Sequence, residues 1–301
     1  MQFVVNGVGY TGRRVLAGIP AERTIGINRS ALTDFSGDRL ITLDLDRAGA
    51  AQLRLPPPFT LLYTVPPSAD SPSDHRLERF LSLLDPAPVR FVYISTSGVY
   101  GDCAGALVRE TDTPRPLTER ARRRFAAEEM LRLWCSKKEC ALFILRAPAI
   151  YGPGRLGIEK IRAGKAILRE SESNPGNRIH VDDLAACCIA AMTSGKAPGR
   201  YNVADGDFRS PTWFAQTVAA MAGLEPPPEI TRAQAQSVLS AARLSFLSES
   251  RKLDTTKMRK ILRFSPAYAN AENGIRASLI EDGLLRKNTL NNESLNPDSA
   301  I

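Results

Sequence analysis

A short strand that turns through three glycines into a helix opens the chain and limits what it can fold into. Phe3-Val4-Val5 is apolar, Gly7-Val8-Gly9-Tyr10-Thr11-Gly12 follows, and a helical pattern starts at about Gly12. The first glycine permits a tight turn, the second lets a ligand approach the backbone, and the third lets helix and strand pack closely. Free amides at such a helix N-terminus favour phosphate oxygens. We therefore expect this segment, apart from Val8, to bind the pyrophosphate of a dinucleotide.

Short apolar runs alternate with helical patterns through the first half of the chain. After the opening strand the runs are Thr24–Ile27, Thr60–Tyr63, Phe91–Ile94 and Leu142–Leu145. This alternation predicts βαβ crossovers and a parallel sheet, and strands apolar on both faces indicate helices on both sides. The predicted fold is an α/β Rossmann-type doubly wound sheet. Residues 1–155 are predicted to form its NAD(P)-binding domain.

The pattern becomes less regular after residue 154. Residues 155–164 and 210–223 read as helices, and 199–203 read as a strand. We expect residues 156–286 to form mainly a small C-terminal substrate lobe, with segments that return to the main sheet. The polar segment 287–301 is predicted to be a disordered tail.

The end of the second predicted strand bears on the choice of dinucleotide. It reads Gly26-Ile27-Asn28-Arg29-Ser30, without the acid that usually meets the ribose 2′-hydroxyl of NAD. Arg29, between Asn28 and Ser30, offers a guanidinium fork that fits a 2′-phosphate. A solvated loop arginine is the alternative. The pattern favours NADP over NAD.

Two further segments are predicted to line the cofactor. Asp44 and Leu45 follow the run 41–43, at the adenine side, although Asp44 also suits an ordinary turn. Val65 and Pro66 follow the predicted strand 60–63, where backbone contact with the dinucleotide is expected.

Charge and cysteine content exclude several classes of function. The formal net charge of +8 favours anionic ligands. The densest basic run, residues 120–124, lacks interleaved aromatic residues, so nucleic acid binding is not expected. The five cysteines form no Cys-x-x-Cys pair, and we predict free thiols and no metal site. Without a leader pattern or a membrane-length apolar run, the sequence predicts a soluble, cytoplasmic protein.

Several segments match sequence motifs of one large family, and they occur in the same order along the chain. They are Tyr93-Ile94-Ser95-Thr96-Ser97-Gly98-Val99-Tyr100-Gly101-Asp102, Ala126-Ala127-Glu128, Leu145–Gly154, Asn177–Leu184 and Tyr201-Asn202-Val203. As far as about residue 280, the chain resembles the extended short-chain dehydrogenase/reductase family, also called the NAD-dependent epimerase/dehydratase family. The resemblance implies an oxidoreductase or epimerase that moves a hydride between nicotinamide and a carbon beside Thr96.

The family's Tyr-x-x-x-Lys pair is missing from this chain. Placing the family's helix by Ala127-Glu128 puts Arg120 at the tyrosine position and Arg124 at the lysine position, and no tyrosine lies between Tyr100 and Tyr151. The resemblance implies that Thr96 polarises the substrate and that Arg124 holds the cofactor ribose. Arginine cannot donate a proton near neutral pH, because its pKa lies above about 12. Tyr100, Tyr151, a water held by Thr96 or Ser97, and the substrate itself are the candidate proton donors.

Three classes of function fit these residues: an enzyme, a dinucleotide-binding module without catalysis, and a structural or assembly subunit whose basic helix faces a partner. Thr96 and the later motifs favour an enzyme that acts on a small polar metabolite. Positive charge is expected near its substrate site, so we expect that metabolite to be anionic and to resemble a nucleotide sugar. The charge comes from Arg122 to Arg124, Arg155 and Arg178. The replaced tyrosine and lysine favour a dinucleotide-binding regulatory or sensor module that has lost catalysis. Both a monomer and a homodimer fit the sequence. The sequence also predicts a structural His180, and Asp182 and Asp183 as helix caps.

Overall fold

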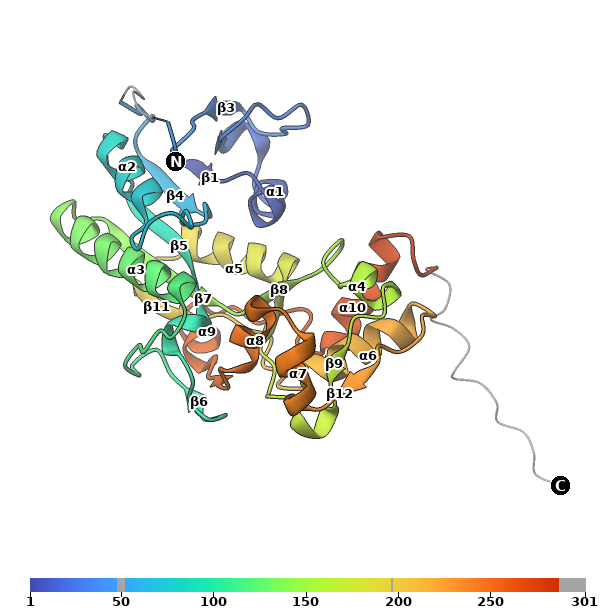
Figure 1. Ribbon diagram of the computed structural model, residues 1–301. Helices are drawn as coiled ribbons and strands as arrows, with labels where there is room; N and C mark the ends of the chain where they lie inside the picture. The colour runs from blue at the N-terminus through green and yellow to red at the C-terminus, as the bar shows by residue number, and fades with distance from the viewer. Residues whose placement is uncertain (48–51, 196, 287–301) are drawn as a thin grey trace.

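A seven-stranded parallel sheet forms the centre of the molecule (Figure 1). A computed structural model describes residues 1–47, 52–195 and 197–286, so the predicted tail 287–301 lies outside the described residues. The strand order is β11-β7-β5-β4-β1-β2-β3. The strands are β1 (Gln2–Asn6), β2 (Thr24–Asn28), β3 (Arg39–Thr42), β4 (Phe59–Tyr63), β5 (Arg90–Thr96), β7 (Ala141–Ala147) and β11 (Gly199–Asn202). The order reverses between β1 and β4, which is where open parallel sheets bind ligands.

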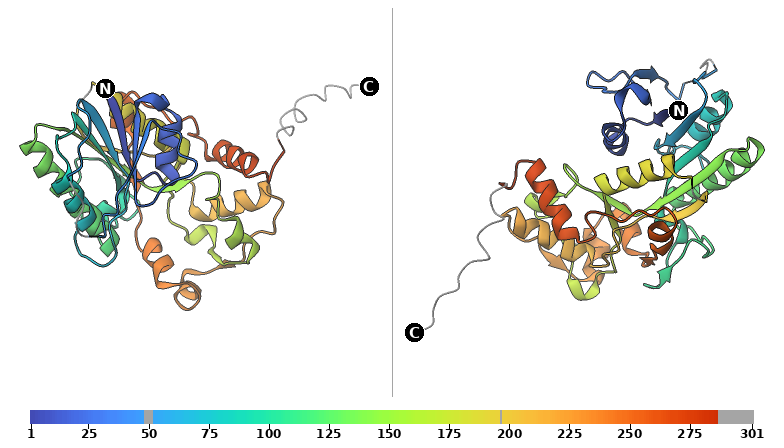
Figure 2. Two further views of the ribbon diagram at one scale, coloured as in Figure 1. Left: turned by 90° about the horizontal axis from the view of Figure 1, so that it is seen from above. Right: turned by 180° about the vertical axis from the view of Figure 1, so that it is seen from behind.

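Helices cover both faces of this sheet (Figure 2). α1 (Tyr10–Ala17) and α5 (Val181–Thr193) share one apolar cluster with Val5 and Leu62. α2 (His75–Leu83) and α3 (Glu119–Lys137) share the other with Val4 and Leu61. Neighbouring strand residues thus face opposite layers, and each fully buried aliphatic side chain contributes about 1.5–3 kcal/mol. The sequence-based prediction of a Rossmann-type doubly wound sheet is confirmed.

The second half of the chain builds a smaller lobe and also returns to the sheet. β11 forms one edge of the main sheet, and α5 packs on α1. The lobe and its connections contain α4 (Ile158–Arg162), α6 (Pro211–Met221), α7 (Arg232–Val238), α8 (Ala241–Leu247), α9 (Thr256–Lys260) and α10 (Ala271–Glu281). Short strand pairs join β6 (Leu107–Val108) to β13 (Lys252–Leu253), β8 (Ala149–Tyr151) to β10 (Arg178–His180), and β9 (Ile167–Leu168) to β12 (Glu229–Ile230). The described residues also include the 3₁₀ helices η1 (Ala21–Arg23), η2 (Ser97–Tyr100) and η3 (Glu170–Glu172).

The N-terminus of α5 differs from the prediction. The cap is His180, whose Nδ1 accepts a hydrogen bond from the Asp182 amide at 3.2 Å. Asp182 instead pairs with Arg14 at 2.9 Å, and the Asp183 carboxylate accepts the Ala267 amide at 2.7 Å. The two acids therefore tie α5 to other elements and do not cap it. The structural role expected for His180 agrees with its complete burial and its Nε2 contact with Ser278 at 3.1 Å.

A buried ion pair fixes α3 against the sheet. Glu128 of α3 and Arg146 of β7 are both completely buried, and Arg146 Nη2 donates to Glu128 Oε2 at 2.6 Å. Ser95 of β5 donates to Glu128 Oε1 at 2.5 Å. This network sets the position of the α3 segment that carries Arg120 and Arg124.

Candidate functional site

A cavity of about 540 Å³ lies where the strand order reverses, at the carboxyl ends of β1, β2 and β4. It brings together all the predicted cofactor residues except Gly12 and Ser30. They are Gly7, Gly9, Tyr10, Thr11, Asn28, Arg29, Asp44, Leu45, Val65, Pro66 and Arg124. The cavity thus has the composition expected for a dinucleotide, with a glycine loop at one side and polar groups at the ends of two further strands.

The three glycines of the loop have different roles. Gly7 has φ +98°, and a Cβ there would collide with Thr64 Oγ1. A Cβ on Gly12 would collide with the Gly7 carbonyl. A Cβ on Gly9 would meet nothing within 4 Å. Gly7 and Gly12 therefore shape the loop, whereas Gly9 leaves open space beside the first turn of α1, which has no side-chain cap.

That open space fits a pyrophosphate, because the amides of the first helical turn have no partner within the helix and attract anions. Tyr10 packs behind the loop, and its hydroxyl donates to the Pro153 carbonyl at 2.9 Å. Burial raises the pKa of Tyr10 to about 12. Tyr10 is therefore neutral at physiological pH and ties the glycine loop to the segment after β8.

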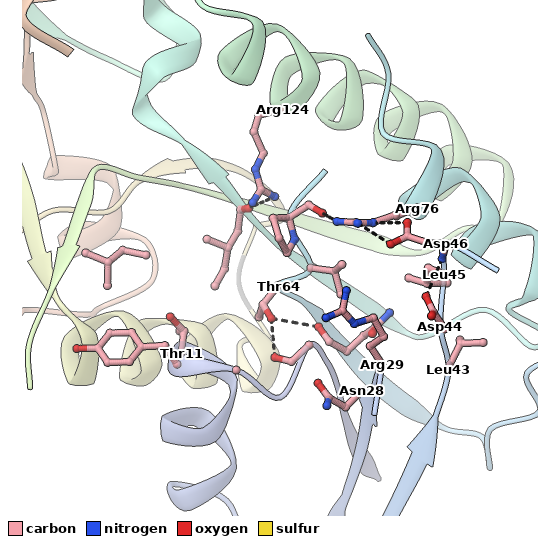
Figure 3. A pocket seen from close by; sticks show the side chains of 18 of the residues that line it. Thr11, Asn28, Arg29, Leu43, Asp44, Leu45, Asp46, Thr64, Arg76 and Arg124 are labelled. Carbon is pink, nitrogen blue, oxygen red and sulfur yellow. Dashed lines mark hydrogen bonds and ion pairs between the residues drawn. The ribbon is translucent and has the colours of Figure 1, made fainter. Parts of the chain in front are cut away.

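Arg29 lines the cavity at the carboxyl end of β2. It follows β2, is exposed, and forms no ion pair with any carboxylate in the described part of the chain (Figure 3). Asn28 donates from Nδ2 to the Ser30 carbonyl at 2.9 Å, which orders this short turn. Across the cavity, Asp44 accepts the Asp46 amide at 3.0 Å and so shapes the loop that follows β3.

Arg76 also lines the cavity, although sequence reasoning missed it. Its Nε and Nη2 donate to the two oxygens of Asp46, each at 2.6 Å, and its Nη1 donates to the Pro66 carbonyl at 3.0 Å (Figure 3). Arg76 thereby joins the loop after β3 to the loop after β4. Nothing in the local sequence around Arg76 signals this contact, because both partners come from earlier loops.

A second cavity of about 560 Å³ adjoins the first, since Ile150 and Arg155 line both. Thr96 lies in it, and its Oγ1 accepts the Gly98 amide at 3.2 Å. None of the residues in the described ranges accepts the hydrogen of that hydroxyl, so it is available to a ligand. Phe214 and Phe246 form apolar walls from the lobe. The second cavity is the candidate substrate site.

Arg120 and Arg124 lie in different cavities. Arg124 lines the first, where its Nη1 donates to Tyr93 Oη at 3.0 Å and to the Ile94 carbonyl at 3.1 Å. Arg120 lines the second, with its guanidinium carbon 4.3 Å from the ring centre of Phe246. The rest of the basic run is used elsewhere: Arg122 pairs with Glu119, and Arg123 approaches the Ala69 and Ser71 carbonyls.

Both candidate tyrosines have buried hydroxyls. Tyr100 lines neither cavity, and its hydroxyl donates to Asn202 Oδ1 at 2.7 Å in the core. Tyr151 lines the second cavity, but its buried hydroxyl lies against Gly274 of α10. Burial raises the pKa of both phenols. The sequence-based placement of Tyr100 among the catalytic residues is therefore not supported by its geometry.

A buried acidic residue contacts Arg178, which lines the second cavity. Asp205 is 1% exposed; its Oδ1 accepts the Asp207 amide at 2.9 Å, whereas its Oδ2 has no hydrogen-bond partner within the described ranges. Burial raises the pKa of Asp205 to about 7. The nearby cation Arg178 is itself buried and lies 3.5 Å from Asp207.

This shifted pKa predicts how stability depends on pH. The folded protein holds the Asp205 proton up to about pH 7, whereas an unfolded aspartate loses it near about pH 3.9. The folded state therefore binds more protons in that window, and the free energy of unfolding falls as the pH rises from about 4 to about 7. We expect Asp205→Asn to remove this fall in the free energy of unfolding between about pH 4 and about pH 7. Urea unfolding of the wild type and the variant at several pH values measures it. Parallel curves for the two proteins would contradict the assignment.

The described ranges contain neither a metal-binding cluster nor a helix able to cross a membrane. No group of three or more His, Cys, Asp or Glu side chains there is arranged to hold a metal ion. None of the helices in these ranges combines the length and apolar character needed to cross a membrane. All five cysteines are free thiols.

A glycine loop at the reversal of a parallel sheet, with a second cavity beside it, is the arrangement typical of dinucleotide-binding α/β proteins. The model of the NAD dependent epimerase/dehydratase family matches residues 76–204. Over these residues the chain is similar to this family, as its motifs predicted.

Three known proteins illustrate the similarity. A functionally unknown conserved protein from Silicibacter pomeroyi is 28% identical, with a TM-score of 0.73 over 93% of this chain and 98% of that one. The UDP-glucuronic acid 4-epimerase from Bacillus cereus, solved in complex with NAD, shares the fold at 16% identity, with a TM-score of 0.71 over 95% of this chain and 100% of that one. The 3-diazoavenalumate denitrifying reductase of a Streptomyces species is 28% identical over 156 residues, 50% of this chain and 51% of that protein. The chain spans about half the length of the curated relatives it matches.

Proposed function

We propose that the chain is an NADP-preferring oxidoreductase or epimerase that acts on a small, polar, anionic metabolite of nucleotide-sugar type. The match to the model of the NAD dependent epimerase/dehydratase family supports a nicotinamide cofactor, and one curated relative is named a reductase. The epimerase from Bacillus cereus, whose name specifies a UDP-sugar acid, supports the substrate type. When bound, the nicotinamide supplies hydride transfer.

The observation that carries the cofactor preference is Arg29. It is an exposed arginine at the end of β2, it lines the first cavity, and the segment Asn28 to Ser30 contains no acid. A carboxylate at this place would repel a 2′-phosphate, whereas a free guanidinium binds it with two charge-assisted hydrogen bonds. Arg124 is proposed to hold the nicotinamide ribose, and Thr96 to donate its hydroxyl hydrogen to a substrate oxygen.

Replacement of Arg29 tests the preference directly. We expect Arg29→Ala to weaken NADPH binding about 10- to 100-fold, because a hydrogen bond to a charged group contributes about 1.5–3 kcal/mol. NADH binding should change little. Calorimetric titration with each cofactor measures both affinities, and Arg39→Ala is the matched control, since Arg39 is exposed on the adjacent β3 and lines no described cavity. Equal loss of NADPH and NADH affinity in Arg29→Ala would refute the phosphate contact.

A second candidate is a dinucleotide sensor without catalysis. It is favoured by the two arginines at the tyrosine and lysine positions and by the buried hydroxyls of Tyr100 and Tyr151. Under this alternative, NADPH binds but is never oxidised. Hydride transfer from a UDP-sugar acid to NADP⁺, seen as a gain of NADPH absorbance, or conversion of that UDP-sugar acid to its epimer would establish the enzyme and exclude the sensor.

A further inference from the structure

Two arginines of the substrate cavity are held by aromatic rings and pair with no acid. Arg120 lies over Phe246, and the guanidinium carbon of Arg155 lies 3.8 Å from the ring centre of Tyr10. Neither forms an ion pair with a carboxylate in the part of the chain that the structure describes. Each stack also joins the two halves of the molecule: Arg120 of α3 meets α8 of the lobe, and Arg155, after β8, meets the glycine loop.

The other charged groups of this cavity are already paired. Arg251 donates to Glu249 Oε2 at 2.8 Å, and among the described residues Glu249 is the acid that lines this cavity. Arg178 approaches Asp207 and donates to the Arg209 and Ser210 carbonyls. Arg120 and Arg155 therefore leave uncompensated positive charge at the cavity.

An aromatic ring holds a guanidinium by its face and leaves the N–H groups at the edge free. Those groups match the paired oxygens of a carboxylate or phosphate. Arg155 lines both cavities and so stands at the cofactor end, whereas Arg120 and Phe246 stand on the lobe side. The two fixed guanidiniums offer separate sites for two oxyanions.

We propose that Arg120 and Arg155 form an anion clamp that selects a substrate with an oxyanionic group at each end. This inference rests on the proposed function and names its substrate class more closely. Arg120 then binds an oxyanion of the substrate, at the position where relatives carry a proton donor. Phe246 is a positioning residue that orients the guanidinium of Arg120.

Three ligands test the two arginines of the clamp separately. UDP-glucuronic acid carries a diphosphate and a carboxylate, UDP-glucose carries only the diphosphate, and glucuronic acid carries only the carboxylate. Each is titrated by calorimetry into the full chain saturated with NADPH. We expect UDP-glucuronic acid to bind most tightly, and Arg120→Ala and Arg155→Ala each to weaken it about tenfold or more. In either variant, the affinity for UDP-glucuronic acid should also exceed the affinity for UDP-glucose, or for glucuronic acid, by a smaller factor than in the wild type.

Arg122→Ala is the matched control, because it removes the same charge from the same helix but Arg122 pairs with Glu119 and lines neither cavity. Phe246→Leu should weaken UDP-glucuronic acid only while Arg120 is present, which a purely structural role would not produce. The clamp is overturned if Arg120→Ala behaves like Arg122→Ala, or if wild type binds NADPH but none of the three ligands. A loss of NADPH affinity in Arg155→Ala without loss of anion affinity would assign Arg155 to the cofactor and also overturn it. If wild type does not bind NADPH, the proposed function fails, and the same titrations without cofactor still decide the clamp.

Discussion

Gly9→Val is expected to abolish dinucleotide binding while the protein stays folded. Gly9 has φ −98°, which other residues adopt, and a Cβ there would meet nothing within 4 Å. The added methyl groups would enter the space beside the first turn of α1, where the pyrophosphate is proposed to lie. Loss of two charge-assisted hydrogen bonds, at about 1.5–3 kcal/mol each, predicts an affinity lower by about 100-fold or more.

Gly7→Ala provides the contrast, two residues earlier in the same loop. Its Cβ would collide with Thr64 Oγ1, and φ +98° is unfavourable for alanine. We expect this variant to lose about 2 kcal/mol or more of stability. Calorimetry with NADPH and NADH, together with thermal unfolding followed by circular dichroism, distinguishes the two effects. A Gly9→Val protein that is folded and binds NADPH like wild type would show that the loop does not hold the pyrophosphate.

The parts of the site that depend on neighbouring residues were predictable from sequence. The glycine loop needs only a strand before it and a helix after it, and both lie within the first 17 residues. Arg29 was found because it follows directly after a recognisable strand. Such features depend on local backbone geometry, which a short stretch of sequence determines.

The contacts between distant segments were not predictable. Tyr100 stands in a family motif, but the acceptor of its hydroxyl is Asn202, 102 positions later in β11. The partner of Arg76 is Asp46, 30 positions earlier, and the ring that holds Arg120 belongs to α8. Sequence therefore identified the residues near the chemistry but not which hydroxyls and guanidiniums remain free for a ligand. That depends on packing between the sheet and the lobe.

Removing one partner of the buried pair of Glu128 and Arg146 is expected to cause the largest electrostatic loss of stability among the pairs described. Both side chains are 0% exposed, and each provides hydrogen-bond partners to the other. Glu128→Gln would leave the Arg146 charge buried without its counter-charge, and loss of one partner from such a pair costs about 3–5 kcal/mol. The exposed pair of Glu159 and Arg162 is the control, and Glu159→Gln should cost less than about 1 kcal/mol.

Urea unfolding of the single variants and of the double variant Glu128→Leu with Arg146→Met tests this prediction. Two apolar residues of similar size remove both buried charges together, so the double variant should be more stable than the sum of the single losses predicts. Additive losses would show that the two charges do not stabilise each other. Because Glu128 lies one helical turn after Arg124, Glu128→Gln should also loosen the start of α3 and weaken NADPH binding more than Glu159→Gln does. The pair would then hold the cofactor-binding and substrate-binding arginines in place as well as stabilise the fold.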